Sequence, residues 1–209
     1  MLTIAIEGTD AAGKQTQAAM LKDHLENTGL KVKVVSFPRY DTPIGKLIKS
    51  ALRNEVVMSD MAMHMLLDVD KQDFSDNLLT QELDGFDVII YDRYTMSNMA
   101  YCMAKGIPPD WVINIQSGLV KPDITFILHL PAEVSYERKH SNYSEEDLDK
   151  HEKDIDLLKR AETVYTILYA LSNNPYNQDI IYLVDANKPK EEVSIDIVKL
   201  YEETVASHE

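Results

Sequence analysis

The sequence predicts a three-layer α/β fold, in which a five-stranded parallel sheet carries helices on both faces. Two observations predict it: five short, nearly continuous apolar segments recur along the 209-residue chain, and segments with helically spaced apolar residues lie between them. Strands that are apolar throughout are buried on both faces, which is typical of parallel sheets joined by right-handed crossovers. A chain of this length builds one such core, so residues 1–209 are expected to form a single domain.

The expected strands are short, apolar and rich in β-branched residues, and a turn former or an acidic residue follows most of them. In chain order they cover residues 2–7, 32–37, 87–91, 124–130 and 179–184. Ligands bind beyond the carboxyl ends of the strands in a parallel sheet. We therefore expect the chemistry next to Gly8, Pro38, Asp92, Leu130 and Asp185.

The expected helices are longer and place apolar residues three and four positions apart. Gly29 and Gly106 end two of them, because glycine is a frequent C-terminal cap, and Pro109 and Pro189 open two others. Asp60 is expected to cap a long Met-rich helix. In chain order the helices cover residues 16–28, 44–52, 60–83, 95–105, a segment from 109, the charge-rich region 132–171 and a segment from 189.

Charge and cysteine content restrict the partners and the compartment. The chain has 35 acidic and 21 basic residues, a net charge of −14, which disfavours polynucleotides and anionic lipid surfaces as partners. A small anionic substrate would need a local concentration of cations. Cys102 is the only cysteine, so no intrachain disulfide can form. With no apolar span of membrane length and no signal-like N-terminus, this predicts a cytoplasmic protein.

A phosphate-binding loop follows the first strand. The run Gly8-Thr9-Asp10-Ala11-Ala12-Gly13-Lys14 has the spacing G-x-x-x-x-G-K between a strand and a helix. Such a loop points its N–H groups at phosphate, the helix start adds positive potential, and Lys14 reaches the outer phosphates. The sequence therefore predicts a P-loop NTPase fold that binds nucleotide phosphates. Gln15 stands where the motif has Ser or Thr, so Gln15, a water molecule or Thr16 could serve Mg²⁺, and the sequence leaves these alternatives open.

Two arginines follow the carboxyl ends of the second and third strands. Phe37-Pro38-Arg39 leaves one strand and Asp92-Arg93-Tyr94 leaves the other. Although each arginine alone could form an ordinary surface ion pair, the two together favour a clamp for a second phosphate group. Asp92 stands where a Walker B carboxylate would hold Mg²⁺ or its waters.

In order and spacing, these segments resemble the thymidylate kinase family over nearly the whole chain. The motifs that carry the resemblance are Glu7-Gly8-Thr9-Asp10, Gly13-Lys14-Gln15-Thr16-Gln17, Phe37-Pro38-Arg39, Ile44-Gly45-Lys46-Leu47, Asp92-Arg93-Tyr94 with Ser97, Ala100-Tyr101, Trp111, Lys121-Pro122-Asp123 and Asp185-Ala186. The resemblance implies an enzyme that transfers the γ-phosphate of ATP to dTMP, giving dTDP and ADP. It also implies Mg²⁺ as a cofactor and a homodimer.

The resemblance further implies roles for individual residues. Asp10 would bind the 3′-hydroxyl of the acceptor sugar, and Tyr101 would pack on that sugar. Arg39 and Arg93 would hold the acceptor phosphate, while Arg138 would stack on the adenine of ATP. Phe37 and Ser97 complete the expected acceptor site.

The chain departs from the family pattern in the base pocket and in the lid. Leu67 stands where the family has an aromatic residue over the base, and Lys71 stands where it has an arginine. The lid, expected at about residues 138–152, contains no arginine after Arg138. The nearest substitute cations are Lys139, Lys150 and Lys153, and Lys150 is the one in the expected Asp149-Lys150-His151-Glu152 context.

Four alternatives stay open at this stage. Leu67 and Lys71 allow a monophosphate kinase with a different or relaxed base preference. A nucleoside kinase is possible, but it would have no use for two phosphate-binding arginines. A nucleotide-binding switch is disfavoured because Asn187-Lys188-Pro189-Lys190 lacks the aspartate of a guanine-reading motif. The last alternative is a binding module that has lost turnover.

Overall fold

The computed structural model describes residues 1–77, 85–142, 153–172 and 179–207 of the chain. Its sheet has the strand order β2-β3-β1-β4-β5, and every neighbouring pair is parallel. The strands are β1 (Leu2–Gly8), β2 (Val32–Ser36), β3 (Val88–Asp92), β4 (Ile124–His129) and β5 (Ile180–Asp185). The predicted parallel sheet is therefore confirmed, with strand ends shifted by one residue at most positions.

Eight helices surround this sheet in the described residues. They are α1 (Lys14–Asn27), α2 (Pro43–Leu52), α3 (Asp60–Asn77), α4 (Thr95–Ala104), α5 (Pro109–Ile115), α6 (Ala132–Asn142), α7 (Ile155–Ser172) and α8 (Lys190–Ala206). Residues 78–83 of the expected Met-rich helix lie outside the described residues. Ser59 rather than Asp60 caps α3, because the Ser59 hydroxyl accepts the N–H of Ala62 at 3.3 Å.

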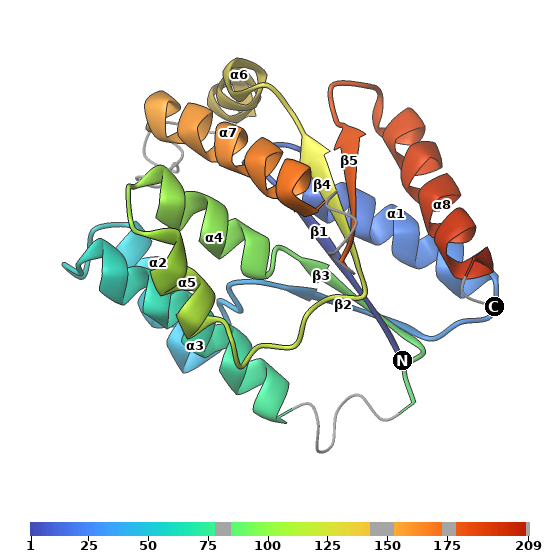
Figure 1. Cartoon of the computed structure of the whole chain (residues 1–209), viewed down its shortest axis with the longest axis horizontal. Helices are drawn as coiled ribbons and strands as arrows, with labels where there is room; N and C mark the ends of the chain where they lie inside the picture. Colours follow the sequence, from blue (N-terminus) through green and yellow to red (C-terminus); the bar gives the residue numbers. More distant parts are fainter. Residues whose placement is uncertain (78–84, 143–152, 173–178, 208–209) are drawn as a thin grey trace.

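The strands alternate their side chains between two apolar layers, so both faces of the sheet are buried. Ile4 and Ile6 of β1 point to the face covered by α1 and α8, where they pack with Leu21 and Ile197. Ala5 points to the other face, which α3, α4 and α7 cover. Figure 1 shows α1 and α8 on one side of the sheet and α3, α4 and α7 on the other. None of the described helices is long and apolar enough to cross a bilayer.

The close approach of β1 to β4 requires a glycine at the end of β1. A Cβ atom on Gly8 would lie 2.5 Å from the carbonyl oxygen of Leu128, and Gly8 has a φ of +135°. Residues other than glycine rarely adopt this backbone conformation. The phosphate loop therefore leaves the sheet at the point where the strand order reverses, between β3 and β4.

Candidate active site

A cavity of about 670 Å³ opens at the carboxyl ends of the central strands. Its walls come from the phosphate loop, from the residues that follow β2 and β3, and from helices α2, α3, α4 and α6. This is the edge of a parallel sheet at which ligands bind. The expected site residues that line it are Asp10, Ala11, Gly13, Lys14, Gln15, Thr16, Phe37, Leu67, Lys71, Asp92, Arg93, Ser97, Tyr101 and Arg138.

The phosphate loop holds Lys14 at the start of α1. Gly13 precedes the helix with a φ of +90°, and Ala11 adopts a φ of +54°. The Lys14 ammonium is buried and donates to the carbonyl oxygen of Thr9 at 2.5 Å. Burial, with the nearby charge of Arg93, lowers the pKa of Lys14 to about 7. Thr9 and Ala12 are themselves buried and support the loop from behind.

Asp10, Arg93 and Tyr101 form one hydrogen-bonded group beside this loop. The Arg93 guanidinium donates to one carboxylate oxygen of Asp10. The Tyr101 hydroxyl donates to the other at 2.7 Å. Burial by itself would raise the pKa of the Asp10 carboxyl, but the charges of Arg93 and Lys14 hold it well below its usual range. The group thus combines an ionised acceptor with a cation at one wall of the cavity.

Glu7 is a buried carboxylate that binds the segment carrying Arg93. Glu7 accepts the main-chain N–H of Tyr94 at 2.9 Å and the hydroxyl of Ser97. Ser97 lies 3.4 Å from a guanidinium nitrogen of Arg93 and 2.9 Å from the hydroxyl of Tyr165. Arg93 has a φ of +64°, which is an uncommon backbone conformation for a residue with a large side chain. Burial raises the pKa of the Glu7 carboxyl.

Glu7 was missed as a site residue by the sequence interpretation, although a signal existed. An acidic residue at the end of an otherwise apolar, fully buried strand must find hydrogen-bond donors there. In the structure it finds them in the segment that carries Arg93.

Arg39, the first of the two arginines predicted to bind the acceptor phosphate, is not among the residues that line the cavity. Its Nε donates to Asp70 at 3.0 Å, and its terminal NH2 donates to Asp73 at 2.7 Å and to the carbonyl oxygen of Asp70 at 2.8 Å. These acceptors lie on α3, so they hold the guanidinium against that helix. The next residue, Tyr40, lines the cavity in its place. The spacing of strand ends predicted the loop but could not predict which of its side chains turns inward.

Three oxygen-bearing side chains that are candidates to bind a divalent cation line the cavity. Thr16, exposed at the start of α1, and Asp92, half-buried at the end of β3, both line the cavity, and so does Gln15. Asp92 also accepts the hydroxyl of Ser36 at 3.3 Å. Within the described residues no cluster of three or more His, Cys, Asp or Glu side chains could hold a metal ion alone. Such a sparse oxygen set fits Mg²⁺, which keeps waters and binds substrate phosphates as further ligands.

The described part of the segment expected to form a lid, residues 138–142, contacts the phosphate loop. A guanidinium nitrogen of Arg138 in α6 is 3.5 Å from the carbonyl oxygen of Ala11. The following residue, Lys139, also lines the cavity. Lys150 and the rest of the expected lid after residue 142 lie outside the described residues.

The residues that α2, α3 and α4 contribute to the cavity combine leucines with buried polar side chains. Leu52 and Leu67 line it together with Lys71, which replaces the expected arginine. His64 and Asn98 line it too, and neither was singled out from the sequence. A histidine and an asparagine within helical apolar patterns give no signal of their joint burial until the helices are packed.

Comparison with known proteins places these features in one family. A family model described as thymidylate kinase matches residues 6–197. The thymidylate kinase of Dictyostelium discoideum is 32% identical over 96% of this chain and 85% of its own length. That of Plasmodium falciparum is 32% identical over 94% of this chain and 87% of its own length. The solved structure of thymidylate kinase from Candida albicans matches with a TM-score of 0.79 and 28% identity, covering 100% of this chain and 93% of that chain.

Proposed function

This chain belongs to the thymidylate kinase family and is an ATP-dependent kinase for dTMP, and on that premise we propose how its residues divide the reaction between them. One observation carries the proposal. The Asp10–Arg93–Tyr101 group is hydrogen-bonded together immediately beside the phosphate loop, in one cavity. This arrangement supports a donor phosphate on the loop and an acceptor nucleotide on the Arg93 side of it.

The donor site is the phosphate loop with Lys14 and Arg138. Main-chain N–H groups at the start of α1 bind the ATP phosphates, as they do at other helix N-termini. Lys14 donates to the outer phosphates once ATP displaces its bond to the Thr9 carbonyl oxygen. Arg138 lies beside the loop, which supports stacking of its guanidinium on the adenine.

Thr16 and Asp92 are the proposed ligands of Mg²⁺, directly or through water. When bound with ATP, Mg²⁺ neutralises charge on the phosphate oxygens. Thr16 supplies a hydroxyl one residue later than the usual motif position, and Gln15 supplies an amide oxygen nearby. Asp92 is the carboxylate of the set, and Ser36 fixes its orientation.

The acceptor site is proposed to use Arg93 for the phosphate and Asp10 for the 3′-hydroxyl of the sugar. Tyr40 supplies a second donor to the phosphate from the loop after β2, in the place first expected for Arg39. Tyr101 packs on the sugar while its hydroxyl keeps Asp10 in position. Ser97 and Glu7 act through Arg93, because they hold its backbone and guanidinium rather than the substrate.

The chemistry needs no covalent intermediate. A phosphate oxygen of dTMP attacks the γ-phosphorus in line, and the bond to the β–γ bridging oxygen of ATP breaks. Lys14 and Arg93 neutralise charge on the transferring group and on the acceptor, and the fixed loop keeps the two phosphates in line. We propose that the segment at about residues 138–152 closes over the nucleotides and that Lys150 adds a cation there.

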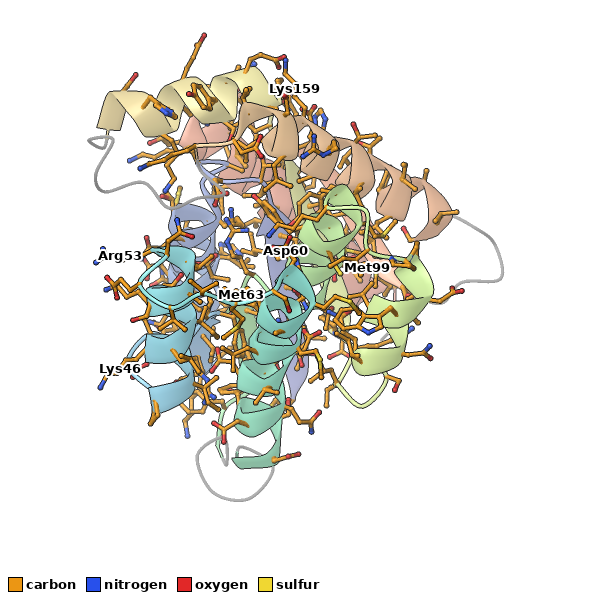
Figure 2. The ribbon with its side chains drawn as sticks, turned by 90° about the vertical axis from the view of Figure 1, so that its left-hand side faces the viewer. Lys46, Arg53, Asp60, Met63, Met99 and Lys159 are labelled. Carbon is orange, nitrogen blue, oxygen red and sulfur yellow. The ribbon has the colours of Figure 1, made fainter. Side chains whose placement is uncertain are left out.

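We further propose a cytoplasmic homodimer that pairs through α3. Met61, Met65 and Val69 recur every four residues on this helix and are 44%, 51% and 48% exposed. Figure 2 shows α3 running down this face of the molecule between α2 and the α4–α5 pair. A contiguous apolar stripe on a surface helix favours burial against a partner. The cytoplasmic location rests on the single cysteine, which fits a reducing compartment.

A panel of nucleotide acceptors tests the proposed site. With ATP and Mg²⁺, we expect dTMP to have the highest kcat/KM among dTMP, dUMP, dCMP, dGMP and dAMP. Thymidine should not be phosphorylated, because Arg93 would have no phosphate to bind. A clear preference for a purine would contradict the proposed base pocket. The relative from Candida albicans is described as having a broad substrate specificity, so the panel also measures how strict this chain is.

A further inference from the structure

His64 of α3 carries a buried ring nitrogen that has no partner at the wall of the active-site cavity. The residue is 0% exposed and lines the cavity. Among the described residues, its Nε2 has no hydrogen-bond partner. Buried polar atoms in folded proteins are nearly always paired, so an unpaired one at a cavity wall points to a ligand atom that completes it.

The hydrogen bonds of Asn98 determine which ring nitrogen of His64 carries the proton. The amide nitrogen of Asn98 donates to the carbonyl oxygen of His64 at 3.0 Å and to a carboxylate oxygen of Asp68 at 2.6 Å. Both of its hydrogens are therefore used, and the amide oxygen must face the Nδ1 of His64, 2.6 Å away. Because that oxygen can only accept, Nδ1 carries a hydrogen and Nε2 of the neutral ring is an acceptor.

Asp68 anchors this arrangement at its other end. Its carboxylate accepts hydrogen bonds from Asn98, from the ammonium of Lys71 at 3.0 Å and from the amide of Gln116 at 3.2 Å. Burial lowers the pKa of the His64 imidazole below that of an ordinary histidine, so the ring is neutral near pH 7. The acceptor character of Nε2 is thus built into the packing of α3 against α4.

Lys71, seven residues after His64 on α3, lines the same cavity and offers a donor there. Two of its three ammonium hydrogens go to the carbonyl oxygen of Leu67 and to Asp68, both at 3.0 Å. The third is available to the cavity that Lys71 lines. The cavity therefore receives one donor and one acceptor from α3, and Leu52 and Leu67, which also line it, offer apolar surface to a flat ring. Thymine has the complementary pair on one edge, a carbonyl oxygen at position 4 next to the N3–H group.

We propose that Nε2 of His64 accepts the N3–H of dTMP while Lys71 donates to the neighbouring carbonyl oxygen. His64 is then a specificity-determining residue, favouring bases with a carbonyl next to a ring N–H. Cytosine presents the reverse order, an amino group next to an unprotonated N3, and so faces His64 with two lone pairs opposed. The inference rests on dTMP as the acceptor and adds the residue that reads its base.

A substrate lacking the N3–H group, combined with a His64 variant, isolates this hydrogen bond. We would measure kcat/KM for dTMP and for N3-methyl-dTMP in the natural chain and in His64→Phe, which keeps an aromatic ring without an acceptor. Methylation should reduce kcat/KM about tenfold more in the natural chain than in His64→Phe. The methyl group adds the same bulk to the substrate of both proteins. The difference between the two reductions in kcat/KM therefore measures the hydrogen bond. Equal reductions in the two proteins would overturn the proposal.

The preference between bases gives an independent readout. In His64→Phe the ratio of kcat/KM for dTMP to that for dCMP should fall about tenfold. His64→Gln, whose amide oxygen can reach the position of Nε2, should retain more of this preference than His64→Phe. A ratio unchanged in His64→Phe would contradict the assignment. Far-UV circular dichroism and thermal unfolding of each variant establish that it is folded before its ratio is measured.

A measurement on the unaltered protein covers the case in which His64 variants do not fold. The ¹⁵N resonance of Nε2 should have the shift of an unprotonated ring nitrogen in the free protein. It should move toward that of a hydrogen-bonded acceptor when dTMP is added, and not when N3-methyl-dTMP is added. A ¹⁵N shift that stays the same when either ligand is added would overturn the proposal. Failure to phosphorylate dTMP at all would instead overturn the kinase assignment, so the two failures are distinguishable.

Discussion

Asp70 binds Arg39 twice, accepting its main-chain N–H at 2.9 Å and its side-chain Nε at 3.0 Å. Asp70 is 0% exposed, so its carboxylate depends on Arg39 for its charge partner. The pair ties the loop after β2 to α3, the helix that carries the base-pocket residues. It also explains why a conspicuous arginine at a strand end does not reach the substrate cavity.

Replacing Arg39 should therefore affect stability more than phosphate recognition. Arg39→Met leaves the Asp70 carboxylate buried without its cation, which should lower the free energy of unfolding by about 3 kcal/mol. Urea denaturation measures this loss. The KM for dTMP should change much less than in Arg93→Met. If Arg39→Met lost as much dTMP affinity as Arg93→Met, the result would show that Arg39 binds the acceptor phosphate.

Arg93→Lys should damage the acceptor side selectively. A lysine keeps the charge but cannot bond Asp10 and a phosphate in the fixed geometry of a guanidinium. We expect kcat/KM for dTMP to fall about hundredfold while the KM for ATP stays close to its natural value. Steady-state kinetics with each substrate varied in turn measures the two effects. An equal rise in both KM values would indicate a general collapse of the loop instead.

Gly8→Ala tests whether the close approach of β1 to β4 positions the phosphate loop. The new Cβ would lie 2.5 Å from the carbonyl oxygen of Leu128 in a backbone with a φ of +135°, so the sheet must shift. We expect a loss of about 3 kcal/mol in unfolding free energy and a large fall in kcat. Gly29→Ala is the matched control, because Gly29 has a φ of +93° but open space around its Cβ position. That control should cost about 1 kcal/mol and leave kcat unchanged.

The fold and the place of the phosphate loop after β1 could be predicted because local sequence determines them. Buried parallel strands read as apolar runs, and the glycine-rich loop needs only its own spacing and the helix that follows. The acceptor wall could not be predicted to the same depth. Arg39 and Arg93 both follow strands. Yet Arg39 binds Asp70 on α3, whereas Arg93 binds Asp10 in the phosphate loop. Side-chain direction there depends on tertiary partners that no local pattern reveals.

The same reason hid the base-reading group. His64 and Asn98 are separated by 34 positions and belong to two helices whose apolar patterns look ordinary. Their hydrogen bond and their burial arise only when α3 packs against α4. Lys71 and Leu67 were recognisable from the family pattern as departures, but their contacts with Asp68 and the leucine wall required coordinates.

Met65→Glu should separate the proposed dimer. Met65 is half-exposed at the middle of the apolar stripe on α3, and a charge there would have to be buried in the pair. We expect the dimer dissociation constant to rise about hundredfold, measured by light scattering coupled to size-exclusion chromatography. Ile195→Glu on α8, a position 65% exposed, is the matched control and should leave the mass unchanged. A natural chain that is monomeric at all concentrations would contradict the α3 interface.

The preference for dTMP over dCMP should weaken in acid because of His64. Burial lowers the pKa of this imidazole from the usual 6.5, so Nε2 stays an acceptor at pH 7 and gains a hydrogen only at a more acidic pH. The charges that act on the ring are those of Lys105, Asp60 and Asp68. Once protonated, Nε2 donates, which suits the unprotonated N3 of cytosine and opposes the N3–H of thymine. The ratio of the two kcat/KM values should therefore fall as pH falls, with a midpoint below 6.5. Taking a ratio cancels ionisations common to both substrates, such as those of their phosphates. In His64→Phe the ratio should be independent of pH over the same range, and a parallel fall in both proteins would assign the effect to another group.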